Sequence, residues 1–238
     1  MKIALIGYGK MGKAIHETAV QRGHEIVLII DVNNTNELND ENLKKVDVAI
    51  EFTSPHTAFA NVSFCLQNKV PVVCGSTGWL EKLEAAKEIA QENKTGLIAA
   101  SNFSVGVNIF FEINKRLASL MNTHKEYKIK LTELHHTEKK DAPSGTAISL
   151  AEQILEQIDR KNKWVNKETI AANELEIISE RIDPAPGTHH IIYSSAIDDI
   201  EIIHTAHNRT GFAVGAVLAA EFIKEKHGFF GMKEVLNL

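Results

Sequence analysis

The stretch KIALIGYGKMG, residues 2–12, decides the fold. An apolar, strand-like run leads into a glycine-rich turn, and a helical pattern over residues 10–22 follows at once. In such a unit the first glycine permits a tight turn, the second lets the backbone approach a pyrophosphate, and the third lets helix and strand pack, while N–H groups at the helix start attract the anion. A glycine-rich turn without a ligand is the alternative. The context favours a dinucleotide site formed by Gly7, Tyr8, Gly9, Lys10, Met11 and Gly12.

Strand-like and helix-like segments alternate through the first part of the chain. Further β-rich apolar runs lie at residues 25–30, 47–52, 70–75 and 96–100, and residues 55–68 and 79–93 carry apolar side chains at helical spacing. Such alternation is typical of βαβ units with a parallel sheet whose strands are buried on both faces. We therefore predict an α/β fold with a Rossmann-like dinucleotide-binding domain.

The order of elements changes after residue 103. Helices are expected at residues 105–121, 146–158 and 212–226, and strands at residues 127–135, 174–182, 189–195 and 200–205. Strands that follow strands indicate an α+β domain with an antiparallel or mixed sheet. We expect this second domain to span residues 104–209. The first domain then comprises residues 1–103 and 210–238, because the last helix has an Ala- and Gly-rich face suited to close packing.

Composition and charge argue against several classes of partner. Among the 238 residues 44% are hydrophobic, and the formal net charge of −5 comes from interspersed signs, so nucleic acid is not an expected partner. Cys65 and Cys74 show neither CxxC spacing nor a disulfide framework. No apolar run is long enough to span a bilayer and no basic leader is seen. We expect a cytoplasmic protein without a membrane partner.

Asp31 ends the second predicted strand, about 20 residues after the glycines, where an acid can bind ribose hydroxyls. Val32 and two asparagines follow it, so a 2′-phosphate would meet a carboxylate and no neighbouring cation. We expect preference for NADH, or use of both NADH and NADPH, unless a distant basic residue supplies the contact. Two further strand ends, at residues 52–55 and 75–78, carry hydroxyl and glycine residues at the edge where open parallel sheets bind ligands.

The densest cluster of reactive groups is HHTEKKDAPSGT, residues 135–146, between a predicted strand and a predicted helix. Adjacent strand residues point to opposite faces, so one of His135 and His136 is expected to act and the other to assist. An imidazole can donate a proton near neutral pH, and Lys139 adds a cation. The start of the helix can bind a carboxylate, which is compatible with capping by Ser144. The cluster suits an anionic, proton-accepting substrate.

A metal site is not expected, although the chain has 11 histidines. HExxH is absent, and adjacent histidines on a strand diverge. Three other functions stay open: another nicotinamide-dependent amino-acid or semialdehyde dehydrogenase on the same scaffold, a module that senses NAD(H) without turnover, and a zinc-binding structural protein. The sensor would leave the His/Lys cluster idle, and the DAPSGT segment after paired histidines argues against the other dehydrogenase.

HHTEKKDAPSGTA resembles the signature HHxxKxDAPSGTA of the dihydrodipicolinate reductase family. GYGKMG, FTSP, GSTG, SNFSVGVN, PGTH and HTAHNRTGFAVGA extend the resemblance over nearly the whole chain. The resemblance implies reduction of 4-hydroxy-tetrahydrodipicolinate, or dihydrodipicolinate, to tetrahydrodipicolinate with NAD(P)H in diaminopimelate and lysine biosynthesis. It also implies a small dicarboxylate substrate and a homotetramer built through the sheet of the second domain.

The resemblance also implies roles for individual residues. His135 is the general acid that protonates the ring carbon, and Lys139 holds a carboxylate. The implied substrate-binding residues are His136, Gly145 and Thr146. Besides residues 7–12, the implied cofactor-binding residues are Asp31, Phe52, Gly75, Ser76, Thr77, Ala100, Ser101, Asn102 and Phe103. This chain departs from the family pattern at Lys10, often arginine, at Ser76 in the usual GTTG, and at Val32, which replaces the arginine of some members.

Overall fold

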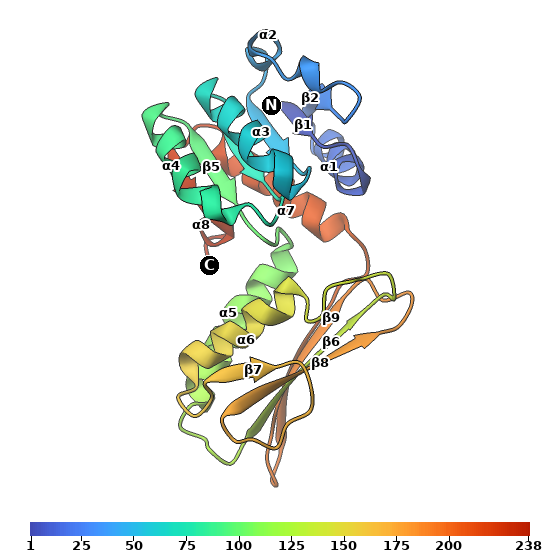
Figure 1. The fold of residues 1–238 in the computed structure, drawn as a ribbon, viewed down its shortest axis with the longest axis vertical. Helices are drawn as coiled ribbons and strands as arrows, with labels where there is room; N and C mark the ends of the chain where they lie inside the picture. The colour runs from blue at the N-terminus through green and yellow to red at the C-terminus, as the bar shows by residue number, and fades with distance from the viewer. The chain divides into compact units, whose positions relative to one another are not determined.

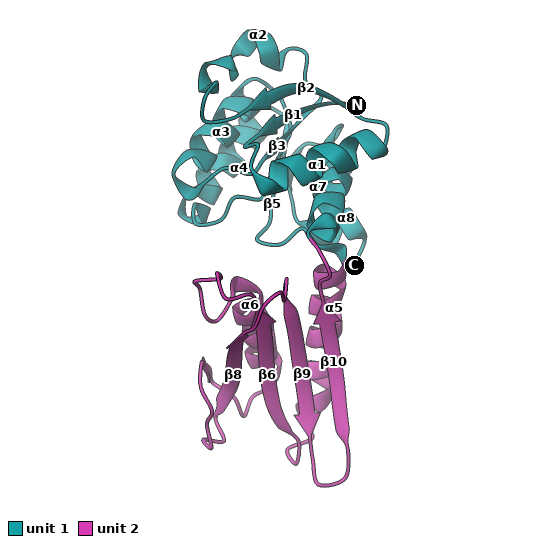
Figure 2. Ribbon diagram, turned by 90° about the vertical axis from the view of Figure 1, so that its right-hand side faces the viewer, with its two compact units in different colours: residues 1–105, 209–238 teal, residues 106–208 magenta.

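The computed structural model describes residues 1–238, which form two compact units. Unit 1 comprises residues 1–105 and 209–238, and unit 2 comprises residues 106–208 (Figure 2). The chain thus completes most of unit 1, forms unit 2 and returns to unit 1, as the colours of Figure 1 show. None of the helices combines the length and the apolar character needed to cross a membrane.

Unit 1 is built on a six-stranded parallel sheet with the strand order β11-β5-β4-β3-β1-β2. Its strands are β1 (Lys2–Ile6), β2 (Glu25–Ile30), β3 (Val48–Glu51), β4 (Val72–Cys74), β5 (Gly96–Ala99) and β11 (Gly228–Phe230). The five predicted strands form at the expected places. β11 was not predicted, because three residues carry no periodic pattern; it forms by pairing with β5. The Rossmann-like arrangement is confirmed.

Helices cover both faces of this sheet, as the apolar runs predict. They are α1 (Lys10–Gln21), α2 (Asp40–Leu43), α3 (Pro55–Gln67), α4 (Leu83–Glu92), α7 (Thr210–Ile223) and α8 (Met232–Leu236), with 3₁₀ turns at Thr35–Glu37 and Leu80–Lys82. Ile3 and Leu5 pack with α1 and α7 on one face, whereas Ala4 and Ile6 pack with α3 and α4 on the other. Alternate residues of one strand thereby enter two cores.

The small residues of α7 allow it to lie close against unit 1. A Cβ atom on Gly215 would overlap the carbonyl oxygen of Phe103, so only glycine fits there. The helix begins at Thr210 and ends at Ile223, slightly earlier at both ends than the pattern predicts, and seven of its residues are buried. This packing fixes the residue that follows Asn102 at the carboxyl end of β5.

Unit 2 is a five-stranded mixed sheet with the order β10-β9-β6-β8-β7. Its strands are β6 (Lys128–His135), β7 (Lys163–Val165), β8 (Glu174–Arg181), β9 (Thr188–Ser194) and β10 (Asp199–Thr205). β6 is parallel to β8 and antiparallel to β9, which confirms the mixed sheet. The helices α5 (Val105–Met121) and α6 (Gly145–Gln157) pack on one face and leave the other face open (Figure 2).

Candidate active site

The glycine-rich turn after β1 has the backbone geometry that the fingerprint requires. Gly7 has a positive φ of +96°, its N–H donates to the carbonyl of Ile30 at 2.9 Å, and a Cβ there would overlap the carbonyl oxygen of Phe52. A Cβ on Gly12 would overlap the carbonyl oxygen of Gly7. Gly9 differs, because nothing lies within 4 Å of the position its Cβ would take. Protein atoms therefore demand Gly7 and Gly12, whereas space for a ligand lies beside Gly9.

The start of α1 suits a bound anion. Gly9 is its N-cap and supplies no side-chain cap, and no acidic residue occupies the first turn. The N–H groups of the first turn of a helix lack intrahelical partners, and the helix dipole adds partial positive charge. Lys10 is exposed on the same turn. These groups fit the pyrophosphate of a dinucleotide.

Asp31 is exposed at the end of β2, in a turn held by asparagine. Its backbone N–H donates to Oδ1 of Asn34 at 2.6 Å, and its own Oδ1 accepts from the N–H of Val32 at 2.7 Å. Asn34 is itself fixed by donating to the carbonyl of Ile29 at 2.9 Å. The Val32 side chain is 83% exposed, so the position after the acid faces solvent and carries no charge.

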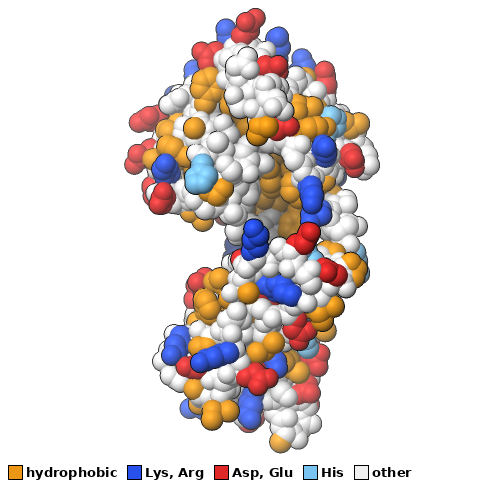
Figure 3. All heavy atoms as spheres, turned by 45° about the vertical axis from the view of Figure 1, so that its right-hand side comes forward, with side chains coloured by type: hydrophobic (Ala, Val, Ile, Leu, Met, Phe, Trp, Pro, Cys, Tyr) orange, Lys and Arg blue, Asp and Glu red, His pale blue; other side chains and the backbone are white.

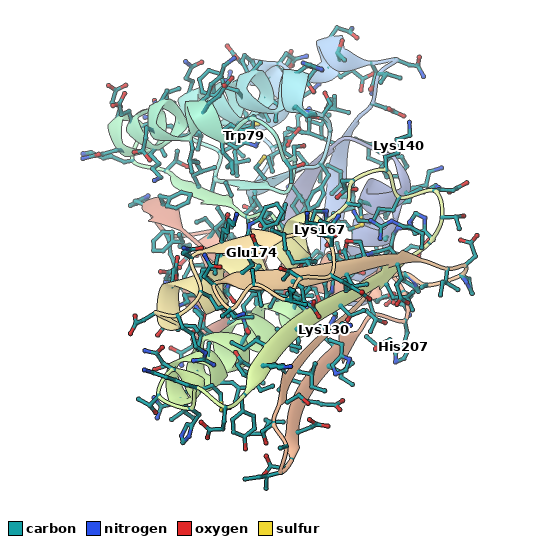
Figure 4. The ribbon with its side chains drawn as sticks, turned by 60° about the horizontal axis from the view of Figure 1, so that its bottom comes forward. Trp79, Lys130, Lys140, Lys167, Glu174 and His207 are labelled. Carbon is teal, nitrogen blue, oxygen red and sulfur yellow. The ribbon has the colours of Figure 1, made fainter.

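The loops after β3, β4 and β5 meet at the carboxyl edge of the same sheet. Gly75 lies so close to the Phe52 ring that a Cβ would overlap it, and the Phe52 and Phe103 rings are 5.6 Å apart. The Thr53 N–H donates to Ser76 Oγ at 2.8 Å, and the Trp79 indole N–H, labelled in Figure 4, donates to the Ser76 carbonyl at 2.9 Å. The structure thus brings together expected cofactor residues from the ends of β3, β4 and β5 in unit 1.

Glu51, at the end of β3, was not predicted as part of this edge. It is fully buried and accepts hydrogen bonds from the Thr53 hydroxyl and from the Cys74 thiol, the latter at 3.0 Å. Burial, together with the charge of Glu51, raises the pKa of Cys74 above its usual range and that of Cys65 to about 12. Glu51 therefore anchors the loop after β3, and burial is the main reason that both thiols stay protonated.

In unit 2, residues 136–144 connect the end of β6 to the start of α6; Lys140 of this loop is labelled in Figure 4. Lys139 Nζ lies 2.8 Å from both carboxylate oxygens of Asp141. This pairing outweighs partial burial and lowers the pKa of Asp141. A second carboxylate that binds Lys139 either shares its ammonium group with Asp141 or takes the place of Asp141.

Two side chains from outside the loop fix its backbone. Arg181, at the end of β8, donates to the carbonyls of Asp141 at 2.6 Å and Lys139 at 3.3 Å. The Thr137 N–H and hydroxyl donate to Asp183 at 3.1 and 2.6 Å. Arg181 and Asp183 were not predicted as site residues, since both fall outside the recognised segment.

His135 ends β6 and faces the covered side of the sheet, where it is 7% exposed, whereas His136 lies beyond the strand and is half-buried. The His135 ring packs edge-on against the His189 ring at 5.2 Å. Burial, reinforced by the neighbouring His135, lowers the pKa of His189 to about 4. The two predicted histidines therefore occupy different environments, and His189, which was not predicted, joins the one that His135 occupies.

The start of α6 is capped as expected. Ser144 Oγ accepts from the Ala147 N–H at 3.1 Å, and nothing lies within 4 Å of the position that a Cβ on Gly145 would take. Thr146 follows on the half-buried side of the first turn. The space beside Gly145 lets a ligand approach the backbone of this turn, where helix N–H groups favour a carboxylate.

Beneath this helix start lies the buried carboxylate of Glu133. It accepts from the Ser144 N–H at 3.0 and 3.1 Å and from the Ser179 hydroxyl at 2.7 Å, and Arg181 Nη2 is 3.4 Å away. Burial opposes ionisation, but hydrogen bonds from His135, Ser144 and Ser179 outweigh it and hold the pKa of Glu133 well below its usual range. The sequence does hold a signal for Glu133: a charged residue stands two positions before His135, on the side of the predicted strand that should face the core.

Donor atoms of Glu133, His135 and His189 lie within 4.8 Å of one another, a spacing compatible with a metal ion. However, the Glu133 oxygens already accept from Ser144 and Ser179, and Ser144 Oγ lies 3.3 Å from His189 Nε2. Groups satisfied by hydrogen bonds gain little from a metal that must first displace those bonds. We interpret the group as a hydrogen-bonded cluster.

Comparisons with known proteins cover both units. The family model described as Dihydrodipicolinate reductase, N-terminus, matches residues 1–103, and the one described as Dihydrodipicolinate reductase, C-terminus, matches residues 106–236. The 4-hydroxy-tetrahydrodipicolinate reductase of Christiangramia forsetii is 47% identical over 237 residues, which is 100% of this chain and 98% of the relative. That of Methanosarcina acetivorans is 36% identical over 242 residues, covering 99% and 89%.

A solved structure extends the similarity to three dimensions. Dihydrodipicolinate reductase from Paenisporosarcina sp. TG-14 with bound dipicolinate has a TM-score of 0.78 and 26% identity, covering 98% of each chain. The residues of the HHTEKKDAPSGTA segment form one connected site in unit 2, and the glycine fingerprint has its expected geometry in unit 1. On these matches, the chain belongs to the dihydrodipicolinate reductase family.

Proposed function

We propose that this protein reduces 4-hydroxy-tetrahydrodipicolinate to tetrahydrodipicolinate with NAD(P)H, in the pathway to diaminopimelate and lysine. The observation that supports this proposal is the loop of residues 136–144, which runs from His135 through Lys139 to the start of α6 and is held by hydrogen bonds to Glu133 and Arg181. A dinucleotide site in the same chain supplies the other half of an oxidoreductase. The names of the two curated relatives agree with it.

The chemistry requires one hydride and one proton, and the 4-hydroxyl group leaves as water, which gives the conjugated ring that is reduced. The nicotinamide, when bound, supplies the hydride and leaves oxidised. His135 supplies the proton to the ring carbon that receives the electron pair of the conjugated system, so a two-electron reduction is complete without a further reductant. General acids of this kind contribute about 10²- to 10⁴-fold to a rate.

Charged and hydrogen-bonding groups of unit 2 bind the carboxylates of the substrate. One carboxylate accepts from the first turn of α6 at Gly145 and Thr146, and Lys139 exchanges Asp141 for a substrate carboxylate, with His136 beside it. The solved relative with bound dipicolinate supports a small aromatic or conjugated dicarboxylate. We assign residues 106–208 as the substrate-binding and tetramerisation domain.

In unit 1 the cofactor contacts residues 7–12, Asp31, Phe52, residues 75–77 and residues 100–103. Asp31 accepts from ribose hydroxyls, and its neighbour Val32 offers no cation for a 2′-phosphate. NADH is therefore preferred, or both cofactors are used.

A homotetramer forms through the open face of the unit 2 sheet. Leu134, Ile178, Ile192 and Ile203 lie on this face, and Ile203 is 57% exposed. Apolar side chains on an uncovered sheet face are stabilised when a second copy covers them. Sedimentation equilibrium tests this assignment: four chain masses are expected, and a monomer at micromolar concentration contradicts it.

The surface and the cysteines suit a cytoplasmic enzyme of small molecules. Lys, Arg, Asp and Glu side chains are interspersed over the face seen in Figure 3, which offers no surface of a single sign for nucleic acid. Both cysteines are free and buried, as a reducing compartment allows.

Coupled oxidation of the nicotinamide tests the function. The protein is mixed with aspartate semialdehyde, pyruvate and the preceding synthase, and loss of absorbance is followed with NADH and NADPH in parallel. Oxidation that depends on the synthase is expected, with kcat/KM for NADH at least equal to that for NADPH. NADH binding without oxidation contradicts the enzyme and favours a sensor, and a large advantage for NADPH contradicts the role of Asp31.

A further inference from the structure

The buried carboxylate of Glu133 has no part in the chemistry described so far. It points to the same side of β6 as Ile129 and Leu131, and it is 0% exposed. A carboxylate buried in this way is destabilising unless its oxygens are satisfied. The groups around Glu133 therefore show which donors stabilise the buried carboxylate and which side chains the carboxylate positions.

The two oxygens of Glu133 have different neighbours. Oε1 accepts from the Ser179 hydroxyl at 2.7 Å, and the Ser144 N–H lies 3.0 Å from Oε1 and 3.1 Å from Oε2. Oε2 lies 3.4 Å from Nδ1 of His135 and 3.8 Å from Nε2 of His189. Oε2 is thus the oxygen that faces the proposed acid.

The two nitrogens of the His135 ring are equally distinct. Nδ1 faces the carboxylate, whereas Nε2 faces Gly187, where a Cβ would lie only 3.1 Å away. Gly187 has a positive φ of +152°, so glycine is also favoured by the backbone. One ring nitrogen therefore lies 3.4 Å from a carboxylate oxygen, and the other lies next to a glycine that has no side chain to block it.

We propose that Glu133 is a positioning residue that accepts the Nδ1 proton of His135, so that the doubly protonated ring delivers its Nε2 proton to the substrate and is left as the neutral Nδ1–H tautomer. The hydrogen bond made by one ring nitrogen sets the protonation of the other. The same carboxylate accepts from the Ser144 N–H, so Glu133 connects the acid to the start of α6 that binds a carboxylate. Delivery of the proton to the substrate rests on the proposed function, whereas the position of the proton on the free ring does not depend on it.

Neighbouring groups reinforce this arrangement. Arg181 Nη2, 3.4 Å from Oε1, favours the ionised carboxylate. The pKa of His189 is lowered to about 4 by burial, so at neutral pH this ring carries no charge that competes for Glu133. Lys139 adds positive charge near the two rings without a hydrogen bond to Glu133, and burial lowers the pKa of His204.

Glu133→Gln is the sharpest perturbation, because glutamine has the shape of glutamate and replaces one acceptor oxygen with an NH₂ donor. Ser144 and Ser179 both donate and will retain the amide oxygen of glutamine. The amide NH₂ must then take the place of Oε2 and point a donor at Nδ1. The neutral His135 ring is then forced to carry its proton on Nε2, and the amide donor facing Nδ1 opposes the doubly protonated ring that the acid requires.

The tautomer is read from the ¹⁵N shifts of the histidine rings by NMR, with His135 assigned from the spectrum of His135→Gln. Glu201→Gln is the matched control, because Glu201 lies on the same sheet, is 44% exposed and pairs with His190 at 3.0 Å. We expect the Nδ1–H tautomer in the wild type and in the control, and the Nε2–H tautomer in Glu133→Gln. We also expect kcat of Glu133→Gln to fall by about 10²- to 10⁴-fold.

An Nε2–H tautomer in the wild type overturns the proposal, and this measurement needs no variant to fold. Wild-type kcat in a Glu133→Gln protein with the Nε2–H tautomer overturns it as well, as does an unchanged tautomer. If the wild type shows no turnover, the proposed function fails, while the ¹⁵N shifts still decide whether Glu133 sets the tautomer.

Discussion

Gly9→Ala separates the needs of the fold from those of the cofactor. Nothing lies within 4 Å of the added methyl, and the backbone of Gly9, with φ of −78°, suits any residue. Loss of backbone freedom in the unfolded chain stabilises such a variant by about 0.4–1 kcal/mol, and the poorer N-cap offsets part of this. We expect the melting temperature to change by no more than about 4 °C.

Binding of the cofactor should respond very differently. A methyl group that meets the pyrophosphate acts as overpacking, which destabilises by about 1–3 kcal/mol. Since 1.4 kcal/mol is tenfold, Kd for NADH should rise about 5- to 140-fold. Fluorescence titration with NADH and thermal denaturation measure the two effects on the same sample.

Gly12→Ala is the matched control, because its methyl would overlap the carbonyl oxygen of Gly7 rather than a ligand. Gly12→Ala should lower the melting temperature even without cofactor, by about 2–4 °C for each kcal/mol that the overlap removes from the free energy of unfolding. If Gly9→Ala binds NADH with the Kd of the wild type, the pyrophosphate does not lie over this turn. If Gly9→Ala is much less stable than the wild type, the space beside Gly9 is not open.

Three further predictions concern unit 2. His135→Gln should lower kcat by about 10²- to 10⁴-fold, roughly 3–5 kcal/mol, in steady-state assays, and near wild-type kcat would refute its role as the acid. Lys139→Ala should lower kcat and raise KM together, since a charge-assisted contact also orients the ring; unchanged kinetics would leave Lys139 as a partner of Asp141 only. Burial lowers the pKa of His189 from 6.5 to about 4, so the unfolded chain binds the proton first and stability should fall as pH drops through this window. Denaturant titrations should show a weaker pH dependence for His189→Gln, and an equal dependence would contradict the buried neutral ring.

The long elements of the fold could be predicted from the sequence, because each carries its own periodic pattern. β6, for example, alternates buried and partly exposed residues along its length. Two edge strands of three residues, β7 and β11, were not predicted; unlike β4, which lies within an apolar run, they form by pairing with β8 and β5. Residue 79, the expected start of a helix, is instead the N-cap of the 3₁₀ turn Leu80–Lys82, and α4 starts at Leu83.

The candidate site was predictable where its residues share a segment, and not where the fold brings distant residues together. Residues 135–146 stand out as a cluster of histidine, lysine and small residues. Arg181 and His189 contribute from other strands, and only the register of β8 and β9 against β6 brings them near His135. The Lys139–Asp141 pair depends on loop conformation, which no spacing rule gives.

The most direct test of the reduction uses a cofactor with two deuterium atoms at nicotinamide C4. The wild-type protein is run in the coupled assay with this NADH, and the product is examined by mass spectrometry. Transfer of one deuterium to the tetrahydrodipicolinate ring is predicted, with the added proton coming from solvent through His135. A product formed without deuterium, or cofactor oxidation without product, would contradict hydride transfer to this substrate.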